Sequence, residues 1–404
     1  MKKMLLSAAA FAVVAVSAVA VAPTTSEAIP AFARQTGAAC LSCHFMSFPT
    51  LASFGRSFKI NGFTDVGEQA LVEDEGLSIP AQLNITAVVR PQFQSVKSTG
   101  AAVSKTAAIT ADQVLLIGGR FGTNSGVFIE YDGTFANIQI MNSFDFGSFR
   151  GGVNIFNTGF GETAGLEVSS VHGQHAGLLN GKNLSAASNI ASAGGNTGGV
   201  ALWAANDWAV ASFSLITDGL FLDGATNNGH ILAPSGRLFL QPEVAGWDTG
   251  IGFGITSGKT GNSATATALG ALPGQKLAMK KFFVDAQAQG ELGDTQIGVY
   301  ADWASADASN AAELNLFNPS TAGKLQGWSI RANIKPLHNI IIGGGAGELK
   351  TVGASKTSQW QIGAEYEVYQ NFVISLIYNN TDVTPVGGVT TTTKTTLLDV
   401  EALI

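Results

Sequence analysis

The sequence of 404 residues has little charge and almost no cysteine. Asp, Glu, Lys and Arg make up 13% of the residues, whereas about 25% is usual in globular proteins. The 22 basic and 29 acidic residues give a formal net charge of −7. This balance argues against a nucleic acid partner, because neutralising phosphates takes clustered Lys and Arg. With only two cysteines, Cys40 and Cys43, a disulfide scaffold is excluded.

Beyond the N-terminal region, the sequence also lacks any apolar run of about 18 residues, the length that a membrane-spanning helix needs. At the N-terminus, Lys2 and Lys3 precede an apolar stretch over 5–22, and Ser26-Glu27-Ala28 has the small-x-small pattern of a cleavage site. These features predict a secretory signal peptide over residues 1–28, the alternative being an uncleaved membrane anchor. The mature protein is therefore expected to be exported and to enter a membrane again only through strands.

Glycine is abundant, at 49 residues, and the apolar fraction is 46%. Most of the polarity comes from Gly, Ser, Thr, Asn and Gln rather than from charge. This composition argues against intrinsic disorder, a coiled coil and a helical membrane bundle. At roughly 100–200 residues per domain, the length allows two or three soluble domains, or one large closed sheet with an appendage.

The two cysteines lie in the sequence Cys40-Leu41-Ser42-Cys43-His44, the attachment motif of a c-type haem. Each thiol can form a thioether to one vinyl group of the porphyrin, and the adjacent histidine then binds the iron. Two other uses compete. A redox disulfide would be expected within a thioredoxin-like βαβ pattern, which is not seen, and a zinc site would need a fourth ligand. We predict one covalent haem c on Cys40 and Cys43, with His44 as the metal ligand.

The residues around the motif suit a haem. Four apolar residues recur at the spacing of one helix face, which predicts an apolar wall against the porphyrin: Phe48, Leu51, Phe54 and Phe58. Arg34, Arg56 and Lys59 could neutralise the haem propionates, or could simply face solvent. The segment 29–79 is too short to enclose a haem as a free-standing cytochrome does, so another part of the chain is expected to cover it.

The stretch over residues 31–64 reads A-F-A-R-Q-T-G-x-x-C-x-x-C-H-x-x-x-F-P-x-L-x-x-F-G-R-x-F-K-x-x-G-F-T. It resembles the outer-membrane cytochrome–porin fusions of iron-oxidising bacteria, in which a short single-haem segment precedes a β-barrel. The resemblance is confined to this stretch. It implies that a c-type haem receives electrons from extracellular Fe(II) and passes them to a periplasmic c-type cytochrome.

From Pro80 onward, apolar and polar residues alternate in short segments separated by turn residues. In one such segment Trp328, Ile330 and Ile334 share a face that excludes Ser329 and Arg331. Segments near 297–303 and 360–368 alternate in the same way. Alternation at period two in strands of about ten residues is typical of outer-membrane barrels, although a soluble sandwich also alternates. Sixteen strands are predicted: 81–95, 112–122, 125–132, 134–145, 148–158, 198–205, 207–218, 236–244, 246–256, 279–291, 293–305, 324–337, 338–350, 357–368, 370–381 and 392–404.

The connections between these strands differ at the two ends. Tight turns near residues 124, 147, 206, 293, 338 and 370 join the strands at one end. Longer loops fall mainly at the other end: 96–111, 159–197, 219–235, 257–278, 306–323 and 382–391. Short periplasmic turns and long extracellular loops distinguish an outer-membrane barrel from a sandwich, and both chain ends then lie on the periplasmic side.

These patterns predict an all-β fold: a transmembrane antiparallel β-barrel of about 16 strands over residues 80–404, preceded by a short helical haem segment over 29–79. A sixteen-stranded barrel is wide enough for a channel. The haem segment leads directly into the first strand, so it is expected to fold into the lumen from the periplasmic rim. The loop 159–197 is expected to cap it.

Other residues that could bind iron have plainer interpretations. Met46 lies too close to His44 to reach the opposite face of the ring and is predicted to pack. Met141 and Met279 are predicted to lie in strands, and His338 in a short turn. Three histidines fall in long loops, where one could meet a haem or arriving iron, although no role at all is the simpler interpretation: His172, His175 and His230. Five inward-facing acids would attract cations into the lumen or merely solvate it: Asp285, Asp302, Glu365, Glu367 and Glu401.

The preferred hypothesis is an outer-membrane monohaem electron carrier, with extracellular Fe(II) as donor and a periplasmic c-type cytochrome as acceptor. Such a protein would oxidise iron without importing it. Two alternatives remain open: a general extracellular electron conduit with another donor or acceptor, and a diffusion porin whose haem segment is a structural or sensory plug.

Overall fold

The computed structural model describes residues 30–67, 69–133, 135–158, 166–171, 197–218, 232–260, 270 and 276–404. The predicted signal peptide, 1–28, lies outside these residues, as do His172, His175 and His230. Within the described residues, the helices belong to the N-terminal segment: α2 (Pro30–Thr36), α3 (Cys40–Cys43) and α4 (Ser53–Ile60). None of them is long and apolar enough to cross a membrane.

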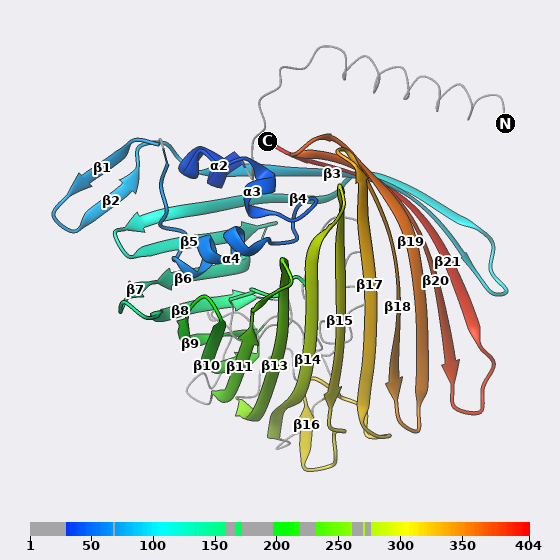
Figure 1. Cartoon of the computed structure of the whole chain (residues 1–404). Coiled ribbons are helices and arrows are strands. Elements are labelled where there is room, and N and C mark those ends of the chain that lie inside the picture. The colour runs from blue at the N-terminus through cyan, green and yellow to red at the C-terminus, as the bar shows by residue number, and fades with distance from the viewer. Residues whose placement is uncertain are drawn as a thin grey trace, which may run out of the picture.

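Most of the remaining described chain forms one closed antiparallel barrel (Figure 1). Consecutive strands are neighbours around the wall, and the last strand pairs with the first to close the ring. Two wall strands are interrupted and carry two labels each, β6 with β7 and β11 with β12. The wall consists of β3 (Ile85–Ser98), β4 (Ser104–Gly122), β5 (Ser125–Tyr131), β6 (Phe135–Asn142), β7 (Phe144–Asp145), β8 (Arg150–Thr158), β9 (Thr197–Ala205), β10 (Ala209–Asp218), β11 (Ala233–Leu240), β12 (Glu243–Val244), β13 (Trp247–Thr260), β14 (Lys276–Leu292), β15 (Thr295–Ala306), β17 (Leu325–Leu337), β18 (Ile340–Thr351), β19 (Ser355–Tyr369), β20 (Phe372–Pro385) and β21 (Thr391–Leu403). The described residues thus confirm the predicted sixteen-stranded barrel.

The apolar and polar residues that alternate in the sequence point alternately to the outside and the inside of the barrel wall. On β17, Trp328 and Ile330 are 44% and 47% exposed, whereas Ser329 and Arg331 between them are 6% and 5% exposed. The same rule holds on β19, where Ile362 faces out and Glu365 faces in. Apolar side chains therefore cover the outside of the barrel, where they would contact lipid, and polar side chains line the inside.

The structure corrects several predicted loops. Most of the predicted loop 96–111 belongs to β3 and β4, and β20 runs into the predicted loop 382–391. These strand ends are rich in Ser, Thr and Lys, so they pair through the backbone without the apolar alternation that marks the lipid-facing part. The short strand β16 (Glu313–Asn315) lies within the predicted loop 306–323. The hairpin of β1 (Leu71–Asp74) and β2 (Leu77–Pro80) stands outside the barrel wall and was not predicted.

The two ends of the barrel differ as predicted. Short turns join β4 to β5, β7 to β8, β9 to β10, β12 to β13, β14 to β15, β17 to β18 and β19 to β20, all at one end. We call this end the turn rim and the opposite end the loop rim. The three helices and the β1–β2 hairpin lie at the turn rim (Figure 1). The segment that carries the two cysteines is therefore found at the end expected to face the periplasm.

Candidate haem site

The C-x-x-C-H motif forms one helical turn followed by a reversal of the chain. α3 comprises Cys40–Cys43, and the backbone N–H of His44 donates to the Cys40 carbonyl at 2.9 Å. His44 then pairs with Leu51 in an isolated antiparallel bridge. The Ala52 N–H closes the loop by donating to the Cys43 carbonyl at 2.9 Å. Backbone hydrogen bonds thus hold the two thiols and the imidazole on one compact unit.

The helix α4 crosses this unit at Gly55. A Cβ atom at this position would lie 2.1 Å from the carbonyl oxygen of Cys43, far inside van der Waals contact. Only glycine allows the two backbones to approach this closely. Gly55 therefore fixes α4 against the cysteine-bearing turn.

The three motif side chains are buried, and burial shifts the pKa values of Cys43 and His44. Cys40 is 1% exposed and His44 is 7% exposed. Desolvation, and secondly the charge of Asp65, raise the pKa of the Cys43 thiol to about 11. Desolvation lowers the pKa of the His44 imidazole to about 4. At neutral pH the Cys43 thiol is protonated and the His44 imidazole is neutral. The neutral imidazole is the form of histidine that binds a metal.

These properties are compatible with a covalent haem, whose two thioether bonds form from free thiols. The two cysteines are not bonded to each other. The Nδ1 atom of His44 is buried and makes no hydrogen bond to the described residues. Cys40 and Cys43 are thus suited to the two thioether bonds, and His44 to the axial position. Among the described residues, the motif included, no group of three His, Cys, Asp or Glu side chains could by itself hold a metal ion.

The N-terminal segment packs on the inside of the wall at positions where the wall strands have glycines. Phe32 of α2 lies over Gly118 of β4, where a Cβ would come within 2.6 Å of the ring. Phe32 also stacks on Phe63, with ring centroids 5.4 Å apart. One strand further on, a Cβ at Gly126 would meet the carbonyl oxygen of Gly62 at 2.0 Å. The glycines of β4 and β5 therefore make room for this segment.

A buried glutamine joins α2 to the start of the barrel. Gln35 is fully buried, and its Nε2 donates to the carbonyls of Phe63 and Asp65 at 2.6 and 2.9 Å. Its Oε1 accepts from Asn84 Nδ2 and from the Arg120 backbone N–H, both at 3.1 Å. Both ends of the side chain are satisfied, so Gln35 couples the helix to β4 without an unpaired polar atom.

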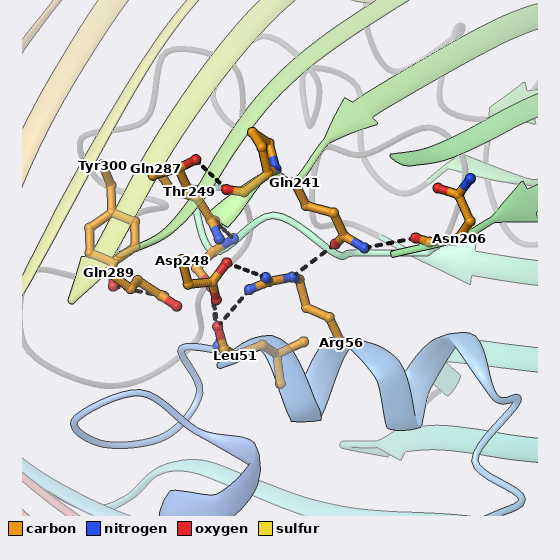
Figure 2. A network of polar contacts seen from close by, with 11 residues as sticks. Leu51, Arg56, Asn206, Gln241, Asp248, Thr249, Gln287, Gln289 and Tyr300 are labelled. Atoms are coloured by element: carbon orange, nitrogen blue, oxygen red, sulfur yellow. Dashed lines mark hydrogen bonds and ion pairs between the residues drawn. The ribbon is translucent and has the colours of Figure 1, made fainter. Parts of the chain in front are cut away.

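On the other side of the lumen, α4 is fixed by Arg56 (Figure 2). The guanidinium is nearly buried and forms an ion pair with Asp248 of β13 at 2.6 Å. It also donates to Gln241 Oε1 at 3.3 Å and to the Leu51 carbonyl at 3.4 Å. One side chain thereby links the helix, the loop before it and two wall strands.

Contacts on a third side involve β17 to β20. The Lys335 ammonium donates to the Met46 carbonyl at 2.7 Å and to Glu367 at 2.9 Å. The Met46 side chain packs against Ile341 and Ile377, in agreement with its predicted packing role. The N-terminal segment therefore contacts the inner wall on several sides of the turn rim.

The described part of the predicted capping loop, 166–171, lies inside the barrel and touches the N-terminal segment. Glu167 forms an ion pair with Lys59 of α4 at 3.2 Å, and the Leu51 N–H donates to Ser170 Oγ at 3.1 Å. The same short stretch reaches the wall, where Ser169 Oγ donates to Asp285 at 2.8 Å. Residues 166–171 thus bridge the wall and the loop that follows the motif.

The predicted apolar helix face is wrong. Phe48 and Leu51 precede α4, and Phe54 within it is 49% exposed. Phe48 instead packs into the wall against Val88 and Val373. The spacing suggested one helix, but Phe48 and Leu51 lie in the chain reversal between α3 and α4, so the four residues do not share a helix axis.

The three predicted propionate partners have protein partners in the structure. Arg56 pairs with Asp248, and Lys59 pairs with Glu167. Arg34 donates to the carbonyl of Ile85. Their positive charges stabilise the docking of the segment on the barrel, a role that the sequence could not separate from cofactor binding.

The predicted lumenal acids do face inward, but several are neutralised. Asp285 pairs with Arg237 at 2.6 Å, and Glu367 pairs with Lys335. Glu401 lies 3.7 Å from Arg90. Asp302 and Glu365 are also buried inward. The effect of these acids on cations in the lumen is therefore weaker than the acidic residues alone would suggest.

The other predicted positions agree with the structure. Met141 and Met279 are buried strand residues, and His338 is exposed in its turn.

Two cavities flank α4 at the turn rim. One of about 770 Å³ lies between α4 and the turns after β7, β9 and β12. The other, of about 380 Å³, is lined by Phe45, Ala52, Trp247 and Gln289. Both are lined by Ser53 and Asp248, so open space adjoins the helix directly after the motif. Volumes of about 300–1,000 Å³ are typical of ligand pockets.

Sequence reasoning missed the residues that position the segment. Gly55, Gln35 and Asp248 carry no chemical signature, because glycines and polar residues are common throughout the chain. The only available signal was the glycine pair Gly55 and Gly62 after the motif. The structure gives Gly55 a close backbone contact and Gly62 a positive φ of 70°.

Comparisons with known proteins identify the barrel fold. No protein-family model and no curated protein sequence matches the chain. Among solved structures, the chain is similar to a loop-deletion mutant of OmpT, an outer membrane protein of Vibrio cholerae, with a TM-score of 0.51, 10% identity, and coverage of 80% of this chain and 99% of that one. It is also similar to an anion-selective porin from Comamonas acidovorans, with a TM-score of 0.50, 10% identity and coverage of 80% and 99%. At this identity the likeness concerns the fold alone: the chain has a porin-like, outer-membrane type of β-barrel.

Proposed function

We propose that this protein is an outer-membrane electron carrier with one covalent haem c. Cys40 and Cys43 would form the thioethers and His44 would be the axial ligand. The observation that carries the proposal is the docking of the C-x-x-C-H segment on the inner wall of a porin-like barrel. A soluble cytochrome would have no reason to be joined in this way to a membrane-spanning wall.

A bound haem would supply a one-electron carrier, reduced as one extracellular Fe(II) becomes Fe(III) and reoxidised by a periplasmic c-type cytochrome. The residues of the chain provide position and exclusion of water. Gly55 and Arg56 hold the motif at the turn rim, where a periplasmic acceptor could approach. Residues 166–171 reach the segment from the lumen side, and burial keeps His44 neutral for binding. Fe(II) as donor rests on the resemblance over residues 31–64.

The first test is attachment. Full-length protein should give a haem-dependent peroxidase band after denaturing electrophoresis, because a thioether-bound haem survives denaturation. Changing both Cys40→Ala and Cys43→Ala should abolish the band, whereas Ser42→Ala, which leaves the motif intact, should retain it. A covalent haem that persists in the double variant would disprove the assignment.

The second test is electron transfer. The protein is reconstituted into liposomes that enclose oxidised cytochrome c, and Fe(II) is added outside. Reduction of the enclosed cytochrome should require the two motif cysteines. If the haem is attached but Fe(II) gives no reduction while another external donor does, the alternative of a general electron conduit replaces iron oxidation.

A diffusion porin is the second candidate, because the sixteen-stranded wall has a polar interior like that of a channel-forming barrel. The two functions differ in whether the N-terminal segment and the inward loop close the lumen. Conductance separates them, since a diffusion porin must pass small solutes with the segment in place.

A further inference from the structure

Lysines gather on the outside of the barrel at the loop rim. Lys97 of β3 and Lys394 of β21 are direct cross-strand partners. Lys105 of β4 lies on the neighbouring strand, opposite Ser95. Figure 1 shows the ends of these strands on the side of the barrel away from the helices. All three lysines are exposed, and we call them the lysine cluster.

The lysine cluster faces out from the barrel. Along β3, Arg90 is buried toward the lumen, and Phe93 is 41% exposed on the opposite face. Lys97 has the same parity as Phe93. On β21, Asp399 is buried inward against Arg90, and Lys394 has the opposite parity. The three ammonium groups therefore belong to the surface that continues the lipid-facing band.

The strand register places two lysines opposite each other, and no described carboxylate forms an ion pair with either. Lys97 directly opposite Lys394 is destabilising, because like charges on facing cross-strand positions repel. Among the described residues, neither forms an ion pair, nor does Lys105. Lys259 on β13 and the partly exposed Lys280 on β14 are different, since both pair with Glu313, at 2.7 and 2.8 Å. A binding site for an external anion accounts for the uncompensated cluster.

The distribution of lysines favours a lipid anion. Within the described residues, every exposed lysine belongs to the loop half of the barrel: Lys97, Lys105, Lys259, Lys324, Lys350, Lys356 and Lys394. Exposed apolar side chains adjoin the cluster on the same strands, with Ile109 of β4 at 79% exposure. Ammonium groups next to an apolar band match a lipid with phosphates at the interface and acyl chains below. Positive charge also repels Fe(II), so the cluster does not collect iron.

We propose that Lys97, Lys105 and Lys394 bind the phosphate groups of an anionic lipid of the outer leaflet, with its acyl chains against the adjoining apolar band. The lipid supplies the counter-charge that the protein lacks at this position. The proposal is independent of haem and of electron transfer.

The test uses the full-length protein refolded in neutral detergent, with lipid A carrying two phosphates as the probe. Native mass spectrometry measures the bound fraction, and thermal unfolding measures the change in Tm. We expect the parent protein to bind lipid A and to gain Tm, and the double variant Lys97→Gln/Lys394→Gln to bind roughly tenfold less. The double variant should also be more stable than the parent in detergent alone, because it removes a repulsion.

The matched control is Lys259→Gln/Lys280→Gln, which removes two lysines of the same rim that already have a carboxylate partner. It should bind lipid A as the parent does. Dephosphorylated lipid A should bind weakly to all three proteins. Equal binding by the two double variants would overturn the proposal, and so would a Tm gain from inorganic phosphate alone that matches the gain from lipid A.

Discussion

At the scale of single residues, the position of the cysteine-bearing turn depends on Gly55, which has no side chain. Gly55→Ala would place a Cβ 2.1 Å from the Cys43 carbonyl oxygen, so α4 must move away from α3. We expect a loss of about 1–3 kcal/mol in the docking of the segment, as for other overpacked sites. Limited proteolysis of the refolded protein should cut within 30–67 faster than in the parent.

Gly236→Ala is the control for this change. Gly236 lies in a wall strand, and the nearest atoms to an added Cβ are 4.0 Å away. This variant should resist protease as the parent does. Unchanged cleavage in Gly55→Ala would mean that the crossing of α3 and α4 is not what holds the segment.

A second residue-scale prediction concerns pH at the loop rim. Hydrogen bonds from Lys259 and Lys280 lower the pKa of Glu313 from 4.5 to about 2. A lowered carboxyl pKa contributes stability above the unfolded value, and that contribution is lost as pH falls from about 4.5 through 2. The difference in Tm between the parent and Glu313→Gln should be constant above pH 5 and shrink below it. Because the lysines are partly exposed, the contribution is at most about 1 kcal/mol. A difference that persists at pH 2 would contradict this origin.

At the scale of elements, the docking of α4 depends on a nearly buried ion pair with the wall. Asp248→Asn leaves the Arg56 guanidinium, whose side chain is 3% exposed, without its counter-charge. Removing one partner of a buried pair is costly; since Asp248 retains some exposure, we expect at most about 3 kcal/mol. Protease added to refolded protein should release the N-terminal segment faster, while the barrel itself stays protected.

Arg150→Gln is the matched comparison for Asp248→Asn. Arg150 pairs with Asp145 at 3.4 Å at the same rim, but both side chains are substantially exposed. Exposed pairs contribute about 1 kcal/mol or less, so this variant should behave as the parent does. If both variants release the segment equally, the rim charges act collectively rather than through the pair of Arg56 and Asp248.

The elements also show which parts of the fold can be predicted from the sequence. Wall strands were predictable because lipid on one side and a polar lumen on the other impose period two on residues such as Trp328 and Ser329. The extended ends of β4 and β20 escaped prediction, since beyond the apolar band both faces meet polar surroundings and the alternation disappears. The β1–β2 hairpin has only four residues in each strand, too few for a periodic signal.

The site was predictable only where chemistry constrains it. Cys40, Cys43 and His44 stand out because haem attachment needs those residue types at that spacing. The wall residues that hold the segment in place do not stand out in the sequence. Asp248 and Lys335, for example, lie some two hundred or more positions away from the residues they contact. Nothing distinguishes them there from other inward-facing polar residues. The pairing emerges only when the barrel closes.

At the scale of the whole molecule, the wall is complete without the N-terminal segment. β21 pairs with β3 to close the ring, and among the described residues no wall strand comes from those before Ile85. The inside of the barrel, by contrast, is shared between parts that are far apart in sequence. The segment 30–67 enters from the turn rim, residues 166–171 cross the lumen, and buried Leu316 and Phe317 pack against wall residues such as Met279 near the loop rim. The backbone pairing that closes the wall therefore does not involve the N-terminal segment.

Planar-bilayer conductance tests whether this segment closes the lumen. The full-length protein should conduct poorly, because the N-terminal segment contacts several sides of the inner wall at the turn rim. A variant lacking residues 30–80 keeps every wall pairing and should still migrate as a heat-modifiable folded barrel. We expect its conductance to rise roughly tenfold, since a wall of sixteen strands encloses an aqueous channel unless side chains or loops fill it. The inward loops should keep it below that of an open porin. If the parent conducts as well as the deletion variant, the segment does not close the lumen, and the diffusion porin becomes the better account of this protein.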